Sequence, residues 1–193
     1  MGADPLEEAS PPLRVRAFFG LPVPDAHRAA LAQYLAACAA AAPTFRWTPA
    51  TNLHLTVRFI GSVDLSIVDG IADRLSARPL AGFELELGDV STFTRGKAVR
   101  VVWLQVRSGA DAARELAAQV EEDCAPAGLA PETRPFQPHL TLARARSREG
   151  AELPPLTPAP QLLPWRAREL VLYRSHLGHA GSVYEPLRTI RLS

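Results

Sequence analysis

The chain of 193 residues is poor in cysteine and lysine, and each shortage limits what it can be. Its two cysteines, Cys38 and Cys124, follow no metal-binding or redox spacing, so we expect buried thiols rather than a disulfide-stapled secreted domain. Lys97 is the single lysine among 21 lysine and arginine residues. Arginine suits bidentate phosphate contacts, although a coding bias that also enriches alanine and proline produces the same composition.

The sequence also lacks a long apolar run and a strong net charge. No segment approaches the length that spans a membrane, and residues 1–12 lack the apolar stretch of a secretory signal. The formal net charge of +1 argues against a global field that attracts long nucleic acids. We therefore expect a cytoplasmic monomer without membrane contact, in which a flexible N-terminal tail over 1–12 precedes a single domain over 13–193.

Hydrophobic periodicity predicts a chain of mixed strands and helices. Asp25 is expected to cap a helix that ends near residue 42. Asp64 or Ser66, and then Ser108, can act as N-caps of two further helices. Strands are expected near 15–21, 53–60, 83–93, 99–106, 168–173 and 184–192, with one more starting at residue 139. The segment 150–164 contains five prolines and indicates an irregular surface loop.

A short pattern of histidine, leucine, threonine and an aliphatic residue occurs twice, at residues 54–57 and 139–142. In a strand, successive side chains point to opposite faces, so each histidine shares a face with its threonine. A strand and a helix precede the motif in both halves of the chain. The order predicts an α+β fold with a duplicated two-lobed architecture, in which two antiparallel sheets flank a central cleft and helices lie on the outside.

Two imidazoles and two hydroxyls that meet in a cleft suit acid–base chemistry on a phosphodiester. Opening the ester requires a base to deprotonate water and an acid to protonate the departing oxygen, and an imidazole titrates near neutral pH. Threonine hydroxyls can donate hydrogen bonds to the non-bridging oxygens. The pattern therefore predicts His54, His139, Thr56 and Thr141 as catalytic residues that use no metal or other cofactor.

The two motifs and their flanks resemble the 2H phosphoesterase superfamily, and within it the bacterial RNA 2',3'-cyclic phosphodiesterases, also called 2'-5' RNA ligases or LigT-like proteins. The first flank is Arg46-Trp47 followed by Asn-Leu-His-Leu-Thr-Val-Arg-Phe-Ile-Gly at 52–61. The second is Arg-Pro-Phe at 134–136 followed by Pro-His-Leu-Thr-Leu-Ala-Arg at 138–144. Residues 16–21 and 174–175 also fit, so the resemblance covers roughly residues 14–193 in the right order.

The resemblance implies hydrolysis of a terminal RNA 2',3'-cyclic phosphate to a 2'-phosphomonoester without a metal, with reversible 2'-5' ligase activity in some members. It implies that His54 donates the proton to the leaving 3' oxygen, that His139 activates water, and that both threonines hold the phosphate. The partners it implies are RNA termini or short oligonucleotides. Two alternatives stay open: a non-catalytic RNA-end-binding protein, and a 2H phosphodiesterase acting on another cyclic or 2'-5' phosphodiester.

Four further residues are candidates for substrate binding. Arg144 is favoured by the resemblance, although simple alternation places it opposite His139 unless a bulge re-aims it. Arg58 has the parity of His54 and is favoured by geometry, and for both arginines a solvent-facing role is the alternative. Trp47 and Phe18 are candidate stacking surfaces for bases, and either could instead belong to the core.

The other histidines carry weaker signals. His176 and His179 have an H-x-x-H spacing, but no acidic or cysteine ligand stands beside them, so no metal site is predicted. His27 is expected to be a solvated residue in the first turn of a helix.

Overall fold

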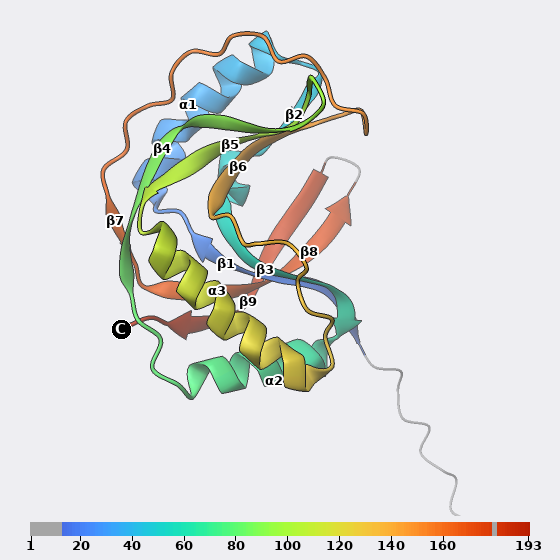
Figure 1. Ribbon diagram of the computed structural model, residues 1–193, viewed down its shortest axis with the longest axis vertical. Helices are drawn as coiled ribbons and strands as arrows, with labels where there is room; N and C mark the ends of the chain where they lie inside the picture. The colour runs from blue at the N-terminus through green and yellow to red at the C-terminus, as the bar shows by residue number, and fades with distance from the viewer. Residues whose placement is uncertain (1–12, 179–180) are drawn as a thin grey trace, which may run out of the picture.

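The computed structural model describes residues 13–178 and 181–193, which form two antiparallel sheets with helices packed outside them (Figure 1). The expected tail over 1–12 and His179 lie outside the described residues. The prediction of an α+β fold with two antiparallel sheets is confirmed. Within the described part of the chain, no helix is long and apolar enough to cross a membrane.

The first sheet has four strands in the order β3-β1-β8-β9. Its members are β1 (Arg14–Pro22), β3 (His54–Asp64), β8 (Glu169–Gly178) and β9 (Gly181–Arg191). β3 carries the first histidine motif at its start, at one edge of the sheet. On β1 the core side alternates regularly, so Val15, Ala17 and Phe19 are buried while Phe18 belongs to the opposite face.

The second sheet has five strands in the order β2-β6-β5-β4-β7. These are β2 (Phe45–Trp47), β4 (Phe83–Arg95), β5 (Ala98–Ser108), β6 (His139–Ala145) and β7 (Trp165–Ala167). β6 carries the second histidine motif. The sequence analysis predicted no strand at β2, which forms through its pairing with β6.

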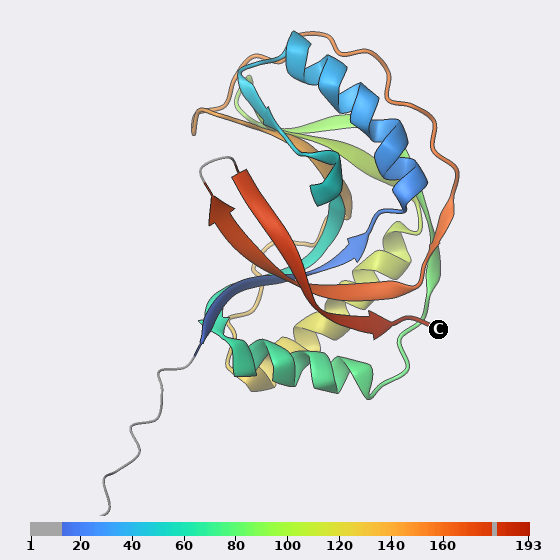
Figure 2. The ribbon, with the colours of Figure 1, turned by 180° about the vertical axis from the view of Figure 1, so that it is seen from behind.

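The two sheets do not correspond to the two halves of the chain. β2 comes from the first half and joins the second sheet, whereas β8 and β9 come from the end of the chain and join the first sheet. β3 and β6 are in contact, so the two motif strands meet although they are far apart in sequence. Figure 2 shows the molecule from behind, with β8 and β9 in orange to red beside β1 in blue, which pairs with β8.

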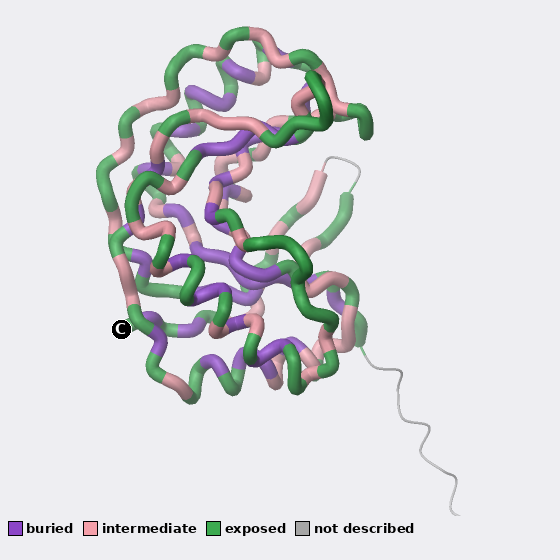
Figure 3. Tube along the Cα trace, viewed as in Figure 1, coloured by how far each residue is buried: buried purple, intermediate pink, exposed green. Residues whose placement is uncertain are grey.

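The helices cover the outer sides of this arrangement. α1 (Asp25–Ala41) packs against β2, and α2 (Leu65–Ser76) packs against β1, β3 and β9. α3 (Ala110–Cys124) contacts β3 and α2, and two short 3-10 turns, η1 (Ala50–Asn52) and η2 (Ala125–Ala127), complete the set. The buried stretches follow the strands and the inner helix faces in Figure 3, and one apolar core includes both cysteines as buried thiols.

Three local predictions were wrong. Asp25 does not cap α1 but is its first residue, and Pro24 takes the cap position. Ser108 does not cap α3: Gly109 precedes the helix with a φ of 85°, and a Cβ on it would lie 2.1 Å from the Glu84 carbonyl oxygen, so only glycine fits. His27 is buried rather than solvated, because its Nε2 contacts the Leu163 carbonyl at 2.7 Å and its ring packs edge-on against Trp165.

Candidate active site

Each motif histidine is held by the backbone immediately before it. The Nδ1 atom of His54 lies 2.8 Å from the carbonyl oxygen of Asn52, and that of His139 lies 2.7 Å from the carbonyl oxygen of Gln137. A carbonyl can only accept, so Nδ1 carries the hydrogen in both neutral rings and Nε2 carries the lone pair. The two imidazoles are therefore in the same tautomer, with Nε2 available for proton transfer.

The Nε2 atoms differ in their surroundings. That of His54 lies 2.9 Å from the hydroxyl oxygen of Thr56, which donates to the neutral ring. Among the described residues, Nε2 of His139 has no hydrogen-bond partner, and Thr141 contributes none. The site thus contains one imidazole whose Nε2 contacts a hydroxyl and one whose Nε2 has no partner within the described part of the chain.

Burial and positive charge keep both imidazoles neutral. Burial lowers the pKa of His54 to about 4; the hydrogen bond to Asn52 opposes this shift, while the charges of His139 and Arg144 add to it. Burial likewise lowers the pKa of His139, and Arg144 again contributes. The two rings and Arg144 therefore lie within electrostatic reach of one another. An anion placed among them would raise the pKa of both rings and favour the protonated form of one.

A β-bulge in each motif strand decides which arginine faces the site. On β6 a register shift leaves Leu142 and Ala143 both buried, so Arg144 returns to the face of His139 and Thr141. The bulge therefore places Arg144 on the face of His139, where the resemblance implied it, although simple alternation would have placed it on the opposite face. On β3 the matching shift leaves Val57 and Arg58 both buried, and Phe59 takes the place that corresponds to Arg144.

Arg58 consequently points away from the histidines, and the expectation from its parity was wrong. Its guanidinium contacts Glu121 at 2.5 Å and Glu132 at 2.8 Å, and it donates to the Ala130 carbonyl at 2.6 Å. Glu121 also accepts a bond from the backbone N–H of Glu132 at 3.1 Å. Arg58 therefore ties β3 and α3 to the segment that leads into His139.

Aromatic rings surround His54. The ring of Phe18 lies 4.6 Å from the His54 ring, and Tyr184 meets His54 edge-on at 5.1 Å. Tyr173 stacks on Phe18 at 5.1 Å. Gly20 faces the same ring, and a Cβ there would lie 3.2 Å from His54 Cδ2. The structure thus brings Phe18 to His54 as one wall of the site, and adds two tyrosines that the sequence analysis missed because they come from β8 and β9.

Another aromatic pair stands beside His139. Phe93 and Trp103 stack at 4.7 Å, and both meet the His139 ring edge-on, at 5.2 and 5.6 Å. Trp103 lies opposite Thr141 in the β5–β6 pairing, a relation that sequence spacing does not reveal. Trp47 is not in either group: its indole N–H donates to the Ala42 carbonyl at 3.1 Å, and it packs with Phe45 on the core.

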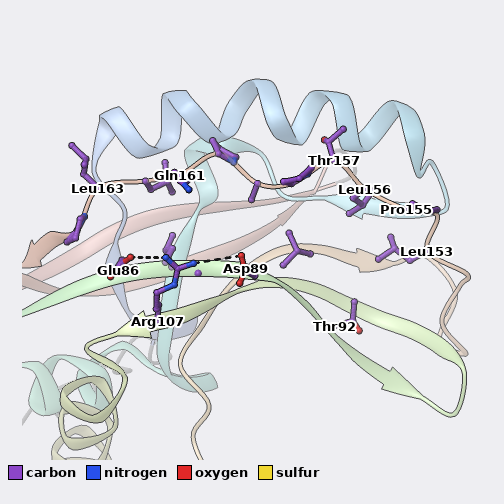
Figure 4. A pocket seen from close by; sticks show the side chains of 18 of the residues that line it. Glu86, Asp89, Thr92, Arg107, Leu153, Pro155, Leu156, Thr157, Gln161 and Leu163 are labelled. Atoms are coloured by element: carbon purple, nitrogen blue, oxygen red, sulfur yellow. Dashed lines mark hydrogen bonds and ion pairs between the residues drawn. The ribbon is translucent and has the colours of Figure 1, made fainter.

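Among the residues that the structure describes, the two motif histidines belong neither to a metal-ligand cluster nor to the groove beside β4. No group of three metal-ligating side chains occurs among residues 13–178 and 181–193, and His176 pairs with Glu185 at 2.7 Å. A groove of about 740 Å³ lies between β4 and the proline-rich connection 153–164, with Arg107 bonded to Glu86 inside it (Figure 4). Neither motif histidine lines that groove. The two facing motif strands thus form a candidate two-histidine acid–base site.

The chain is similar in sequence to a protein family and to several named proteins. Residues 23–179 match the family model described as the 2'-5' RNA ligase superfamily. A protein of Aeropyrum pernix named RNA 2',3'-cyclic phosphodiesterase is 38% identical over 95 residues, covering 49% of this chain and 54% of the relative. The chain therefore spans about half the length of that relative. A protein of the same name from Escherichia coli is 32% identical over 140 residues, covering 72% of this chain and 75% of the relative.

A solved structure extends the likeness to the fold. Escherichia coli LigT complexed with 3'-AMP matches with a TM-score of 0.79 at 28% sequence identity, covering 94% of this chain and 99% of that chain. The chain belongs to the 2'-5' RNA ligase superfamily, which confirms the family resemblance drawn from the two motifs.

Proposed function

We propose that the protein is an RNA 2',3'-cyclic phosphodiesterase that hydrolyses a terminal 2',3'-cyclic phosphate to a 2'-phosphomonoester. The observation that carries the proposal is the pair of imidazoles from two strands, held in one tautomer and within electrostatic reach of each other. Family membership and the names of the relatives support the substrate.

In the proposed reaction, Nε2 of His139 takes a proton from water as the water oxygen attacks phosphorus. The bond between phosphorus and the 3' oxygen breaks, and protonated Nε2 of His54 gives its proton to that oxygen. Each such transfer contributes roughly 10²–10⁴ in rate. The roles are those that the family resemblance implies. The site supports them, because Nε2 of His139 has no hydrogen-bond partner among the described residues and can accept a proton directly.

The Thr56 hydroxyl can bond both to His54, the proposed acid, and to a phosphate oxygen. While His54 is neutral, the Thr56 hydroxyl donates to Nε2. Once Nε2 is protonated, the hydroxyl oxygen can accept from it, and the hydroxyl hydrogen becomes free for a non-bridging phosphate oxygen. Thr141 and Arg144, on the other motif strand, supply the remaining donors to the same oxygens. No metal or other cofactor is needed for this sequence of steps.

We also propose that the enzyme works as a cytoplasmic monomer whose residues 13–193 form one bilobal domain. Both halves of the site come from a single chain, and strands from each end of the chain join both sheets. Reversal of the same steps would join RNA ends through a 2'-5' bond, so ligation is proposed as the minor activity. A non-catalytic RNA-end binder and a different phosphodiester substrate are the alternatives.

The test is hydrolysis of a short RNA ending in a 2',3'-cyclic phosphate, in EDTA, by wild type, His54→Ala and His139→Ala. His176→Ala is the matched control, because it removes an exposed imidazole that pairs with Glu185. We expect a 2'-phosphate product and loss of at least about 10²-fold in kcat for each motif variant, with the control unchanged.

The products separate the alternatives. A 3'-phosphate product would support phosphodiesterase activity but show that the 2' oxygen, not the 3' oxygen, is the leaving group. Tight binding of the RNA end without turnover would contradict the proposed enzymatic activity and support a non-catalytic RNA-end-binding protein. Turnover only of a cyclic mononucleotide or a 2'-5' dinucleotide would identify another phosphodiester as the substrate.

A further inference from the structure

Two arginines lie directly opposite each other on neighbouring strands of the second sheet. In the β2–β6 pairing, Arg46 is the register partner of Arg144. Directly paired residues point to the same face of a sheet, with Cβ atoms about 5 Å apart. The neighbouring pair of Trp47 and Ala143 turns toward the core, so both guanidinium groups extend from the opposite face, which carries His139 and Thr141.

This pair has no counter-charge within the described residues. Neither Arg46 nor Arg144 takes part in an ion pair there, whereas most other arginines of the two sheets and helices do. Both residues are exposed. Like charges directly opposite each other in a sheet are destabilising, so the fold gains nothing from Arg46 at this place. An anionic ligand would remove the repulsion.

We propose that Arg46 binds a backbone phosphate of the RNA next to the terminal one, while Arg144 serves the terminal phosphate at the histidines. This inference rests on the proposed action on RNA ends and adds a second phosphate contact to it. Arg144 acts on the pKa of both histidines, but Arg46 does not, so Arg46 lies one strand further from the reacting phosphate. A mononucleotide has no second phosphate and cannot use it.

Another arginine offers a competing route for the RNA. Arg16 lies on the Phe18 face of β1, but its guanidinium rests on the ring of Phe59, 4.6 Å from the centroid. That contact is an attractive cation–π interaction and accounts for the position of Arg16 without a ligand. The unpartnered Arg46 is therefore the stronger phosphate ligand of the two.

The experiment measures binding rather than turnover. The probes are a fluorescent tetra-adenylate ending in a 2'-phosphate and adenosine 2'-monophosphate, each titrated with wild type, Arg46→Ala, Arg46→Lys and Arg16→Ala at several salt concentrations. Arg95→Ala is the control, because it removes an exposed arginine of the same sheet that pairs with Glu149. Thermal unfolding of each variant provides a second readout.

We expect Arg46→Ala to weaken oligonucleotide binding roughly threefold to tenfold more than mononucleotide binding, and to reduce the slope of log Kd against log salt by about 0.7. Arg46→Lys should keep the slope, and Arg95→Ala should match wild type. The melting temperature of Arg46→Ala should equal or exceed that of wild type, since a repulsion is removed.

Three results would overturn the inference. These are an unchanged slope in Arg46→Ala, an equal loss for both probes, and a slope that falls in Arg16→Ala instead. Because binding is measured, failure of hydrolysis by wild type would overturn the proposed function while a lost slope in Arg46→Ala would still support the second phosphate contact.

Discussion

The hydroxyl oxygen of Thr56 lies 2.9 Å from Nε2 of His54, and the described residues contain no matching contact between Thr141 and His139. The two copies of the motif are thus equal in sequence and unequal in hydrogen bonding. The Thr56 hydroxyl can donate to the neutral ring or accept from the protonated ring, so it stays bonded to His54 in both forms, whereas Thr141 makes no such contact with His139.

Replacing each threonine with valine separates these effects. Thr56→Val should lower the pKa of His54 below its value of about 4, because the protonated ring loses a charge-assisted acceptor that is stronger than the donor lost by the neutral ring, and Thr141→Val should leave the pKa of His139 unchanged. Both variants should lose roughly 10²-fold in kcat through the missing phosphate donor. Imidazole titration by NMR measures the first effect; equal pKa shifts in the two variants would contradict the asymmetry.

Arg144→Gln should raise the pKa of both His54 and His139, since its charge lowers the two together. We also expect kcat/KM for the cyclic phosphate to fall roughly 10²–10³-fold, as when one donor to a developing oxyanion is removed. The same NMR titration and steady-state kinetics check both statements. Unmoved imidazole pKa values would contradict the electrostatic effect of Arg144 on the two rings, and an unchanged kcat/KM would contradict its contact with the phosphate.

Acid should weaken the fold through His54. Its pKa is about 4 when folded, against about 6.5 when exposed, so the unfolded chain binds more protons between these values. The stabilising contribution is complete above pH 6.5 and is lost as pH falls toward 4. Urea unfolding of wild type and His54→Asn, from about pH 4 to pH 7, measures it. Relative to the variant, wild type should lose stability on acidification, and parallel curves would count against the buried neutral imidazole.

Arg58→Gln tests a structural role in place of the binding role that strand parity suggested. Arg58 is 7% exposed and contacts Glu121 and Glu132, which are themselves partly in water. Removing one member of a buried pair costs about 3–5 kcal/mol, and the exposure of the carboxylates points to the low end of that range. Denaturant unfolding measures the loss, with Arg95→Gln, an exposed pair with Glu149, expected to stay within about 0.5 kcal/mol. A change confined to KM would restore the substrate-binding role.

The two aromatic candidates should behave differently. Phe18→Leu removes a ring 4.6 Å from His54 and should lower kcat, because the imidazole loses the wall that orients it. Trp47→Phe removes the hydrogen bond to the Ala42 carbonyl and should cost about 1 kcal/mol of stability with kinetics unchanged. Steady-state kinetics and thermal unfolding of both variants check this. A raised KM in Trp47→Phe would indicate that Trp47 contacts the substrate.

Local patterns predicted the strands and helices well where they are periodic. The helix at Asp25–Ala41 and the strands at Phe83–Arg95 and Ala98–Ser108 follow directly from spacing, because apolar side chains must face one core. The pairing of β2 with β6 and the left-handed Gly109 depend on contacts between distant segments, and no local pattern carries them.

The sequence by itself determined the family, the two histidine motifs and the sharing of a face by each histidine and its threonine, because strand alternation is a property of the local backbone. Tertiary structure alone decided which arginine faces the site. A bulge on β6 turns Arg144 toward His139, and the matching bulge on β3 turns Arg58 toward Glu121. One extra residue in a strand reverses every later side chain, and its presence is set by pairing with a neighbouring strand that lies far away in the sequence.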